Sequence, residues 1–225
     1  EFELTNETIY LGETTNLDDR YTLVKWYARE TGAIAPNYDI REDDFDYQLT
    51  WVSGTQPVAG EDYKPSVDST FRIAPMIKKY QGCEGEGCWV SVVHPTHTVF
   101  DSENSEKQTF TIFVETLKLT IIKSVVDNDL DPNQSFVFYI TADNGYEKTI
   151  VIQGNGSVSL VGLPIGTYTV EEDTDWSYRY DTNSAIQETT LSRSKQKDEI
   201  TVVNTIKPDV PWLSGEHYVI NRYEK

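Results

Sequence analysis

Three polar residues in the second half of the chain each end a row of apolar residues. The segments "LKLTIIK", "GTYTVEED" and "EITVVNTI" alternate between apolar and polar residues. Side chains alternate between the two faces of a β-strand, so each segment has one apolar face that ends in a polar residue. These faces are Leu119, Ile121 and Lys123; Tyr168, Val170 and Glu172; and Ile200, Val202 and Asn204. The pattern predicts that a lysine, a glutamate and an asparagine point into one core, while Glu171 faces water.

Burial would make these three side chains reactive toward one another. Unpaired ions are costly in an apolar interior, so burial favours a neutral amine on Lys123 and a neutral acid on Glu172. The amine is then a nucleophile, and the acid can polarise the carboxamide of Asn204 and move protons to its nitrogen. Attack by the amine would release ammonia and leave an amide bond between Lys123 and Asn204. Proximity alone would drive this reaction, so the sequence predicts no cofactor.

The elements that must hold these residues are predicted to be strands. Nearly every apolar run is short, rich in β-branched or aromatic residues, and bounded by Gly, Asn, Asp or Pro. This pattern indicates an all-β fold, which we interpret as two tandem β-sandwich domains. We place them at residues 1–115 and 116–207, followed by a linker or strap at 208–225. The first domain resembles bacterial immunoglobulin-like modules in its strand spacing and in Trp51, which we expect to be buried.

The second domain resembles the Cna B-type, prealbumin-like domains of Gram-positive adhesins and pilins. The residues that carry the resemblance are the lysine in "LTIIKSV", the segment "GLPIGTYTVEED" and the terminal "VVNTI". The resemblance implies an intramolecular isopeptide bond between Lys123 and Asn204, with Glu172 assisting its formation. It also implies an extracellular location on a bacterial cell wall.

The segment "LPIGT" is similar to a cell-wall sorting signal but departs from it in its last two positions. It lies before a predicted strand and has no apolar helix or basic tail after it. We interpret it as a turn, because Pro164 fixes one backbone dihedral and Gly166 permits a positive φ.

The two cysteines lie in "CEGEGC", on either side of a four-residue, Gly-rich loop. Such a loop can bring the sulfurs together, so we expect a disulfide between Cys83 and Cys88 in a secreted protein. Two alternatives stay open: free thiols, and a thioester between a cysteine and a glutamine such as Gln108. Lys25 is not expected to form a second isopeptide bond, because the strand "QTFTIFVE" has no asparagine or aspartate.

No metal site is predicted. Asp127, Asp129 and Asp131 alternate as in a calcium loop, but the glycine and the closing glutamate of an EF-hand are missing, so we interpret them as a solvated turn. His94 and His97 have no third ligand in the sequence and are expected at the surface.

The net charge of −18 disfavours binding to nucleic acids or to anionic membranes, because both would repel the chain. We therefore expect a structural stalk or adhesin segment of a surface protein, joined to further domains of its parent and without turnover activity. The alternative is a ligand-binding head whose first domain recognises a host protein or glycan through loops such as "SGTQPVAGEDYKP". An accessory module of an extracellular enzyme is the weakest hypothesis, since no other catalytic group of residues stands out.

Overall fold

The computed structural model describes most of both halves of the chain. The described residues are 2–23, 45–77, 80–83, 89–92, 109–126 and 133–208. The chain divides into two compact units, which are considered one at a time. Unit 1 comprises Glu1–Ile9 and Glu13–Val114, and unit 2 comprises Tyr10–Gly12 and Glu115–Lys225. Among the described residues the regular structure is all β except for one 3-10 helix, η1 (Leu17–Arg20).

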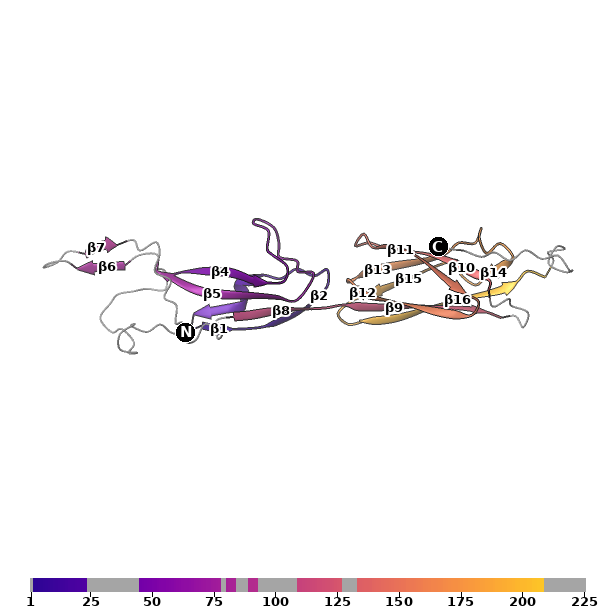
Figure 1. Cartoon of the computed structure of the whole chain (residues 1–225), viewed down its shortest axis with the longest axis horizontal. Coiled ribbons are helices and arrows are strands. Elements are labelled where there is room, and N and C mark those ends of the chain that lie inside the picture. The colour runs from indigo at the N-terminus through magenta and orange to yellow at the C-terminus, as the bar shows by residue number, and fades with distance from the viewer. Residues whose placement is uncertain are drawn as a thin grey trace. The chain divides into compact units, whose positions relative to one another are not determined.

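Unit 2 is a sandwich of two four-stranded sheets (Figure 1). One sheet has the order β12-β9-β16-β14, and the other has the order β11-β10-β13-β15. Their strands are β9 (Leu117–Val125), β10 (Ser135–Ala142), β11 (Glu147–Gln153), β12 (Gly156–Leu163), β13 (Gly166–Glu172), β14 (Tyr180–Thr182), β15 (Ile186–Leu191) and β16 (Lys197–Ile206). Within these sheets only β9 and β16 pair in parallel. The first and last strands of the sandwich are therefore direct neighbours.

The core of unit 2 lies between its two sheets and is almost entirely aliphatic and aromatic. Side chains from both sheets contribute to one buried cluster that includes Leu119, Ile121, Phe138, Tyr168 and Val202. The burial pattern of β9 alternates along its length, as the sequence predicted. Removing this apolar surface from water is the main force that holds the sheets together.

Unit 1 contains a four-stranded sheet of order β2-β8-β5-β4 and two pairs of strands, β1-β3 and β6-β7. The strands are β1 (Phe2–Leu4), β2 (Glu7–Tyr10), β3 (Tyr21–Leu23), β4 (Phe45–Ser53), β5 (Ser69–Ile77), β6 (Tyr80–Cys83), β7 (Trp89–Val92) and β8 (Thr109–Glu115). Its core is built on aromatic rings: Phe71 stacks on Phe110 at 5.5 Å between centroids and meets the edge of Tyr63 at 5.3 Å.

The expectation that Trp51 is buried was wrong. Its side chain is 40% exposed, although it pairs across the sheet with the fully buried Phe71. Trp51 lies on β4, at one edge of the four-stranded sheet, and the pairing register shifts between Trp51 and Ser53. An edge strand has a neighbour on one side only, and the irregularity turns the strand locally, so the ring is not enclosed.

In the segment "LPIGT", Leu163 ends β12 and Gly166 begins β13, so Pro164 and Ile165 form a tight connection between two strands, as the sequence predicted. Tyr168 Oη donates a hydrogen bond of 2.7 Å to the Pro164 carbonyl. A Cβ atom at Gly166 would lie 2.5 Å from Asn144 Nδ2, so this side chain would have to shift for any other residue, and the positive φ also favours glycine. The turn thus sets the start of β13, the strand that carries Glu172.

Candidate functional site

The strand pairing of unit 2 brings Lys123 and Asn204 to the same region of one sheet. On the parallel ladder between β9 and β16, Lys123 is opposite Val202, and Asn204 is opposite Val125. The two residues are therefore diagonal neighbours, and both are buried. Glu172 is the last residue of β13 in the other sheet. The acid reaches the lysine and the asparagine from the opposite side of the sandwich.

The carboxylate of Glu172 bridges the other two side chains. Lys123 Nζ donates to Glu172 Oε2 at 3.1 Å, and Asn204 Nδ2 donates to Glu172 Oε1 at 2.6 Å. Lys123 is 1% exposed, Glu172 is 2% exposed and Asn204 is 0% exposed. Glu171, by contrast, is exposed. The prediction that these three side chains face the core while Glu171 faces solvent is therefore confirmed. None of these contacts tests the covalent bond itself.

The neutral form of the Lys123 amine is favoured more strongly at this buried site than it would be in water. Burial lowers the pKa of Lys123 to about 8, although the charge of Glu172 and its hydrogen bond act in the opposite direction. The ring of Phe136 lies 4.5 Å from Lys123 Nζ and closes one side of the site. At neutral to mildly alkaline pH, a substantial fraction of this lysine can therefore lose its proton and become a nucleophile.

One polar atom of Asn204 has no partner in the described part of the chain. Its Oδ1 is buried and has no hydrogen-bond partner among the described residues. The two ends of a carboxamide are distinguished only by their hydrogen bonds, so the amide could also present its oxygen to Glu172. That orientation requires a proton on the acid, because two oxygens cannot pair without one. The unsatisfied oxygen therefore marks the atom that a neutral Glu172 would polarise.

Sequence reasoning missed one member of this site, Ser177. It lies in the connection between β13 and β14, is 2% exposed, and its Oγ donates to Glu172 Oε1 at 2.7 Å. It follows Glu172 by five residues, a spacing that matches no strand period. Nothing in the sequence pattern therefore identified it as a neighbour of the acid.

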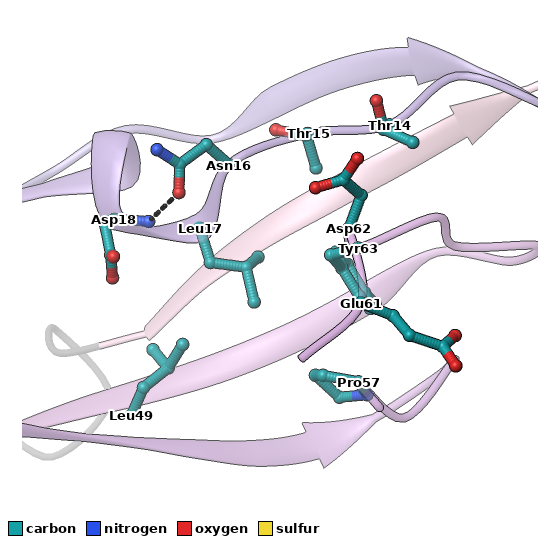
Figure 2. A pocket seen from close by; sticks show the side chains of 10 residues that line it. All are labelled: Thr14, Thr15, Asn16, Leu17, Asp18, Leu49, Pro57, Glu61, Asp62 and Tyr63. Carbon is teal, nitrogen blue, oxygen red and sulfur yellow. Dashed lines mark hydrogen bonds between the residues drawn. The ribbon is translucent and has the colours of Figure 1, made fainter. Parts of the chain in front are cut away.

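Unit 1 contains a pocket of about 430 Å³ between η1 and the loop before β5 (Figure 2). Leu17 and Leu49 contribute apolar side chains to its lining, as Figure 2 shows. Three carboxylates, those of Asp18, Glu61 and Asp62, also line it, and none of its described lining residues is a lysine or an arginine. The loop "SGTQPVAGEDYKP", which was proposed from the sequence for recognition, contributes part of this lining.

Several residues singled out in the sequence lie outside the described part of the chain. Cys83 ends β6, and its backbone pairs with that of Trp89, but its side chain and all of Cys88 are not described. The disulfide therefore stays a prediction. Others outside the described ranges are Lys25, His94, His97, Gln108, Asp127, Asp129 and Asp131. Within those ranges, no group of three or more His, Cys, Asp or Glu side chains could hold a metal ion.

Comparisons with known proteins match part of the chain. Residues 119–207 match the model of a domain of unknown function, DUF5979. No curated protein matches the chain. Among the residues that the structure describes, no helix is long and apolar enough to cross a membrane.

Solved structures of bacterial adhesins and pilins are similar to this chain at low identity. A Mobiluncus mulieris adhesin, described as containing intramolecular disulfide, isopeptide and ester bond cross-links, is 13% identical with a TM-score of 0.43. The match covers 63% of this chain and 60% of that one. The pilus-presented adhesin Spy0125 is 16% identical with a TM-score of 0.38, covering 67% and 40%. The Bacillus cereus major pilin BcpA is 14% identical with a TM-score of 0.35, covering 69% and 41%. At this level of similarity, the function has to be argued from the site.

Proposed function

We propose that unit 2 is a self-crosslinking module in which an isopeptide bond joins Lys123 and Asn204, and that the chain is a stalk or adhesin segment of a Gram-positive surface protein. The observation that supports this proposal is the burial of a lysine and an asparagine that both hydrogen-bond to one buried acid. Buried charges of this kind seldom stabilise a fold compared with apolar residues, so a chemical role explains them better than a structural one.

The reaction uses only these three side chains. A proton moves from the Lys123 ammonium to Glu172, which makes both groups neutral without changing their total charge. Glu172 then donates to Asn204 Oδ1, and Lys123 Nζ attacks Cγ of Asn204. The Nζ–Cγ bond forms and the Cγ–Nδ2 bond breaks. Glu172 passes a proton from the attacking nitrogen to the departing one, so ammonia leaves and the acid is regenerated.

The bond would connect the first and last strands of the sandwich. Pulling on unit 2 through its ends loads β9 at Leu117 and β16 at Ile206. Because these strands are parallel neighbours, the force shears their ladder along its whole length rather than opening it one pair at a time. With the bond in place, force passes from Lys123 to Asn204 and the chain between them bears none. This property suits a surface protein exposed to shear and proteases.

Intact mass tests the proposal directly. The full chain, measured after reduction, should be lighter than its sequence by the mass of one ammonia. Lys123→Ala, Asn204→Ala and Glu172→Ala should each restore the full mass. Glu171→Ala is the matched control, because this neighbouring carboxylate is exposed and should leave the mass shift intact. A wild-type chain of unshifted mass would refute the crosslink.

A second function, ligand binding by unit 1, is favoured by the pocket between η1 and the loop before β5. Its three carboxylates and its apolar lining side chains suit a cationic group on an apolar stem, such as a lysine or arginine side chain of a host protein. Lysine amide and arginine amide, titrated by NMR, are suitable probes. Asp62→Asn with Glu61→Gln should weaken their binding, whereas Glu171→Gln in unit 2 should not. Equal binding by both variants would exclude this pocket.

A further inference from the structure

We propose that Ser177 is a positioning residue for bond formation between Lys123 and Asn204; the inference rests on the function proposed above. Glu172 accepts three hydrogen bonds in the described structure. Oε2 accepts from Lys123, and Oε1 accepts from Asn204 and from Ser177. Two of these donors are the reacting groups themselves. Ser177 is the donor to this carboxylate that the reaction does not consume.

The orientation of the carboxyl group decides whether Glu172 can serve both partners. Oε2 must face the amine while Oε1 faces the amide, and a rotation of the carboxyl would break this arrangement. During the reaction Lys123 loses its protons and the amide of Asn204 is cleaved, so neither can hold the acid in place throughout. The hydroxyl of Ser177, 2.7 Å from Oε1, can do so at every stage.

The Ser177 hydroxyl also lies close to a second acceptor, which helps to keep it in place. Its Oγ lies 3.0 Å from the backbone carbonyl of Asp173. A hydroxyl has one hydrogen to donate and lone pairs that accept. It can donate to Oε1 while Glu172 is ionised, and once Oε1 is protonated and donates to Asn204, the remaining lone pair of Oε1 can still accept from it. The serine thus remains beside the acid in both states without moving.

The loop that presents Ser177 is fixed by hydrogen bonds at several points. Asp173 Oδ1 accepts from the Trp176 backbone nitrogen at 2.9 Å, and the Asp173 carbonyl accepts from the Ser177 nitrogen at 3.0 Å. The indole of Trp176 donates to the Ser135 carbonyl at 3.1 Å, which joins the loop to the start of β10. These contacts form a rigid turn directly after β13, so the serine is placed by structure outside the reacting residues.

The test measures the rate of bond formation in newly made protein. The full chain is produced by cell-free translation, quenched in denaturant at successive times and analysed by intact mass. Ser177→Ala should reach the same final mass as wild type but about tenfold more slowly, as expected for the loss of one hydrogen bond to a charged group. Ser177→Thr, which restores a hydroxyl, should recover part of the rate.

Ser135→Ala is the matched control, because Ser135 is fully buried, its Oγ has no hydrogen-bond partner among the described residues, and it lies beside the same loop. It should react at the wild-type rate. Melting temperatures are compared in a Lys123→Ala background, which cannot crosslink, and there Ser177→Ala and Ser135→Ala should melt within a few degrees of each other.

The outcomes separate the two proposals. If wild type itself never loses ammonia, the proposed function fails. If wild type reacts but Ser177→Ala reacts as fast as Ser135→Ala, the positioning role is overturned and the crosslink stands. The role is also overturned if Ser177→Thr is as slow as Ser177→Ala, or if Ser177→Ala melts far below Ser135→Ala in the uncrosslinked background, since a loosened fold would then explain the slow rate.

Discussion

The two units use different means to stabilise a β-sheet core. In the described part of unit 1, the buried cluster is Ile9, Tyr63, Phe71, Phe110 and Ile112, and its side chains are apolar or aromatic. Unit 2 buries a larger apolar cluster and, at one end of it, a lysine, an acid and an asparagine. The described cluster of unit 1 has no buried lysine, glutamate or asparagine, whereas unit 2 buries all three, with the lysine and the asparagine in contact with the glutamate carboxylate. The difference agrees with the two proposed functions, crosslinking in unit 2 and recognition in unit 1, and the variants below test each of them.

The largest expected effect is the loss of the crosslink. Glu172→Gln keeps the size of the side chain and one acceptor oxygen but cannot move the protons. In the chain-entropy treatment developed for disulfides, a bond that closes a loop of about 80 residues adds roughly 4 to 5 kcal/mol. Calorimetry should therefore show the unit 2 transition of Glu172→Gln well below that of wild type, with the unit 1 transition unchanged. Glu172→Ala should fall further, because it leaves Lys123 buried without an acceptor.

Single-molecule pulling compares wild type and Glu172→Gln under mechanical force. Wild type should extend by the contour length of unit 1 but not by that of the chain between Lys123 and Asn204, and Glu172→Gln should release both. If wild type and variant melt together and both extend fully, the stalk function loses its main support.

A core truncation in unit 1 should lower the stability of unit 1 and leave that of unit 2 unchanged. Phe71 is fully buried between Tyr63 and Phe110, so Phe71→Ala removes two ring contacts and leaves a cavity. Such changes typically cost about 3 to 5 kcal/mol. The unit 1 transition should fall by that amount, while unit 2 keeps its melting temperature and its mass shift. A parallel fall of both transitions would mean that the two units do not unfold independently.

The sequence predicted the site of unit 2 better than the core of unit 1, and the reason lies in the strands. Lys123, Glu172 and Asn204 each continue an unbroken alternation within a central strand, so their burial followed from a two-residue period. Trp51 lies on an edge strand where the register shifts, and the period fails there. Ser177 lies in a loop, where position depends on turns and capping bonds rather than on a period.

Lys123 should make the stability of unit 2 depend on pH when no bond can form. Burial lowers its pKa from 10.5 to about 8 in the folded state, so between these values the unfolded chain binds more protons than the folded one. Stability therefore rises with pH in this window and is constant below it. Asn204→Ala should gain stability between pH 8 and pH 9.5, by about 1 to 2 kcal/mol. The control Asn204→Ala with Lys123→Met should lack this gain. Urea titration at each pH measures the free energy of unfolding, and an equal rise with pH in both variants would show that Lys123 is not the cause.

The smallest effect should come from Trp51, and it sharpens the contrast with Phe71. Both residues lie opposite each other on the same sheet, but Phe71 is fully buried and Trp51 is 40% exposed. An exposed ring loses little apolar contact on truncation, so Trp51→Ala should lower the stability of unit 1 by about 1 kcal/mol, well below the cost at Phe71. Chemical denaturation of both variants measures the difference. If Trp51→Ala were as destabilising as Phe71→Ala, the indole would be part of the core, and the immunoglobulin-like arrangement expected from the sequence would regain its central residue.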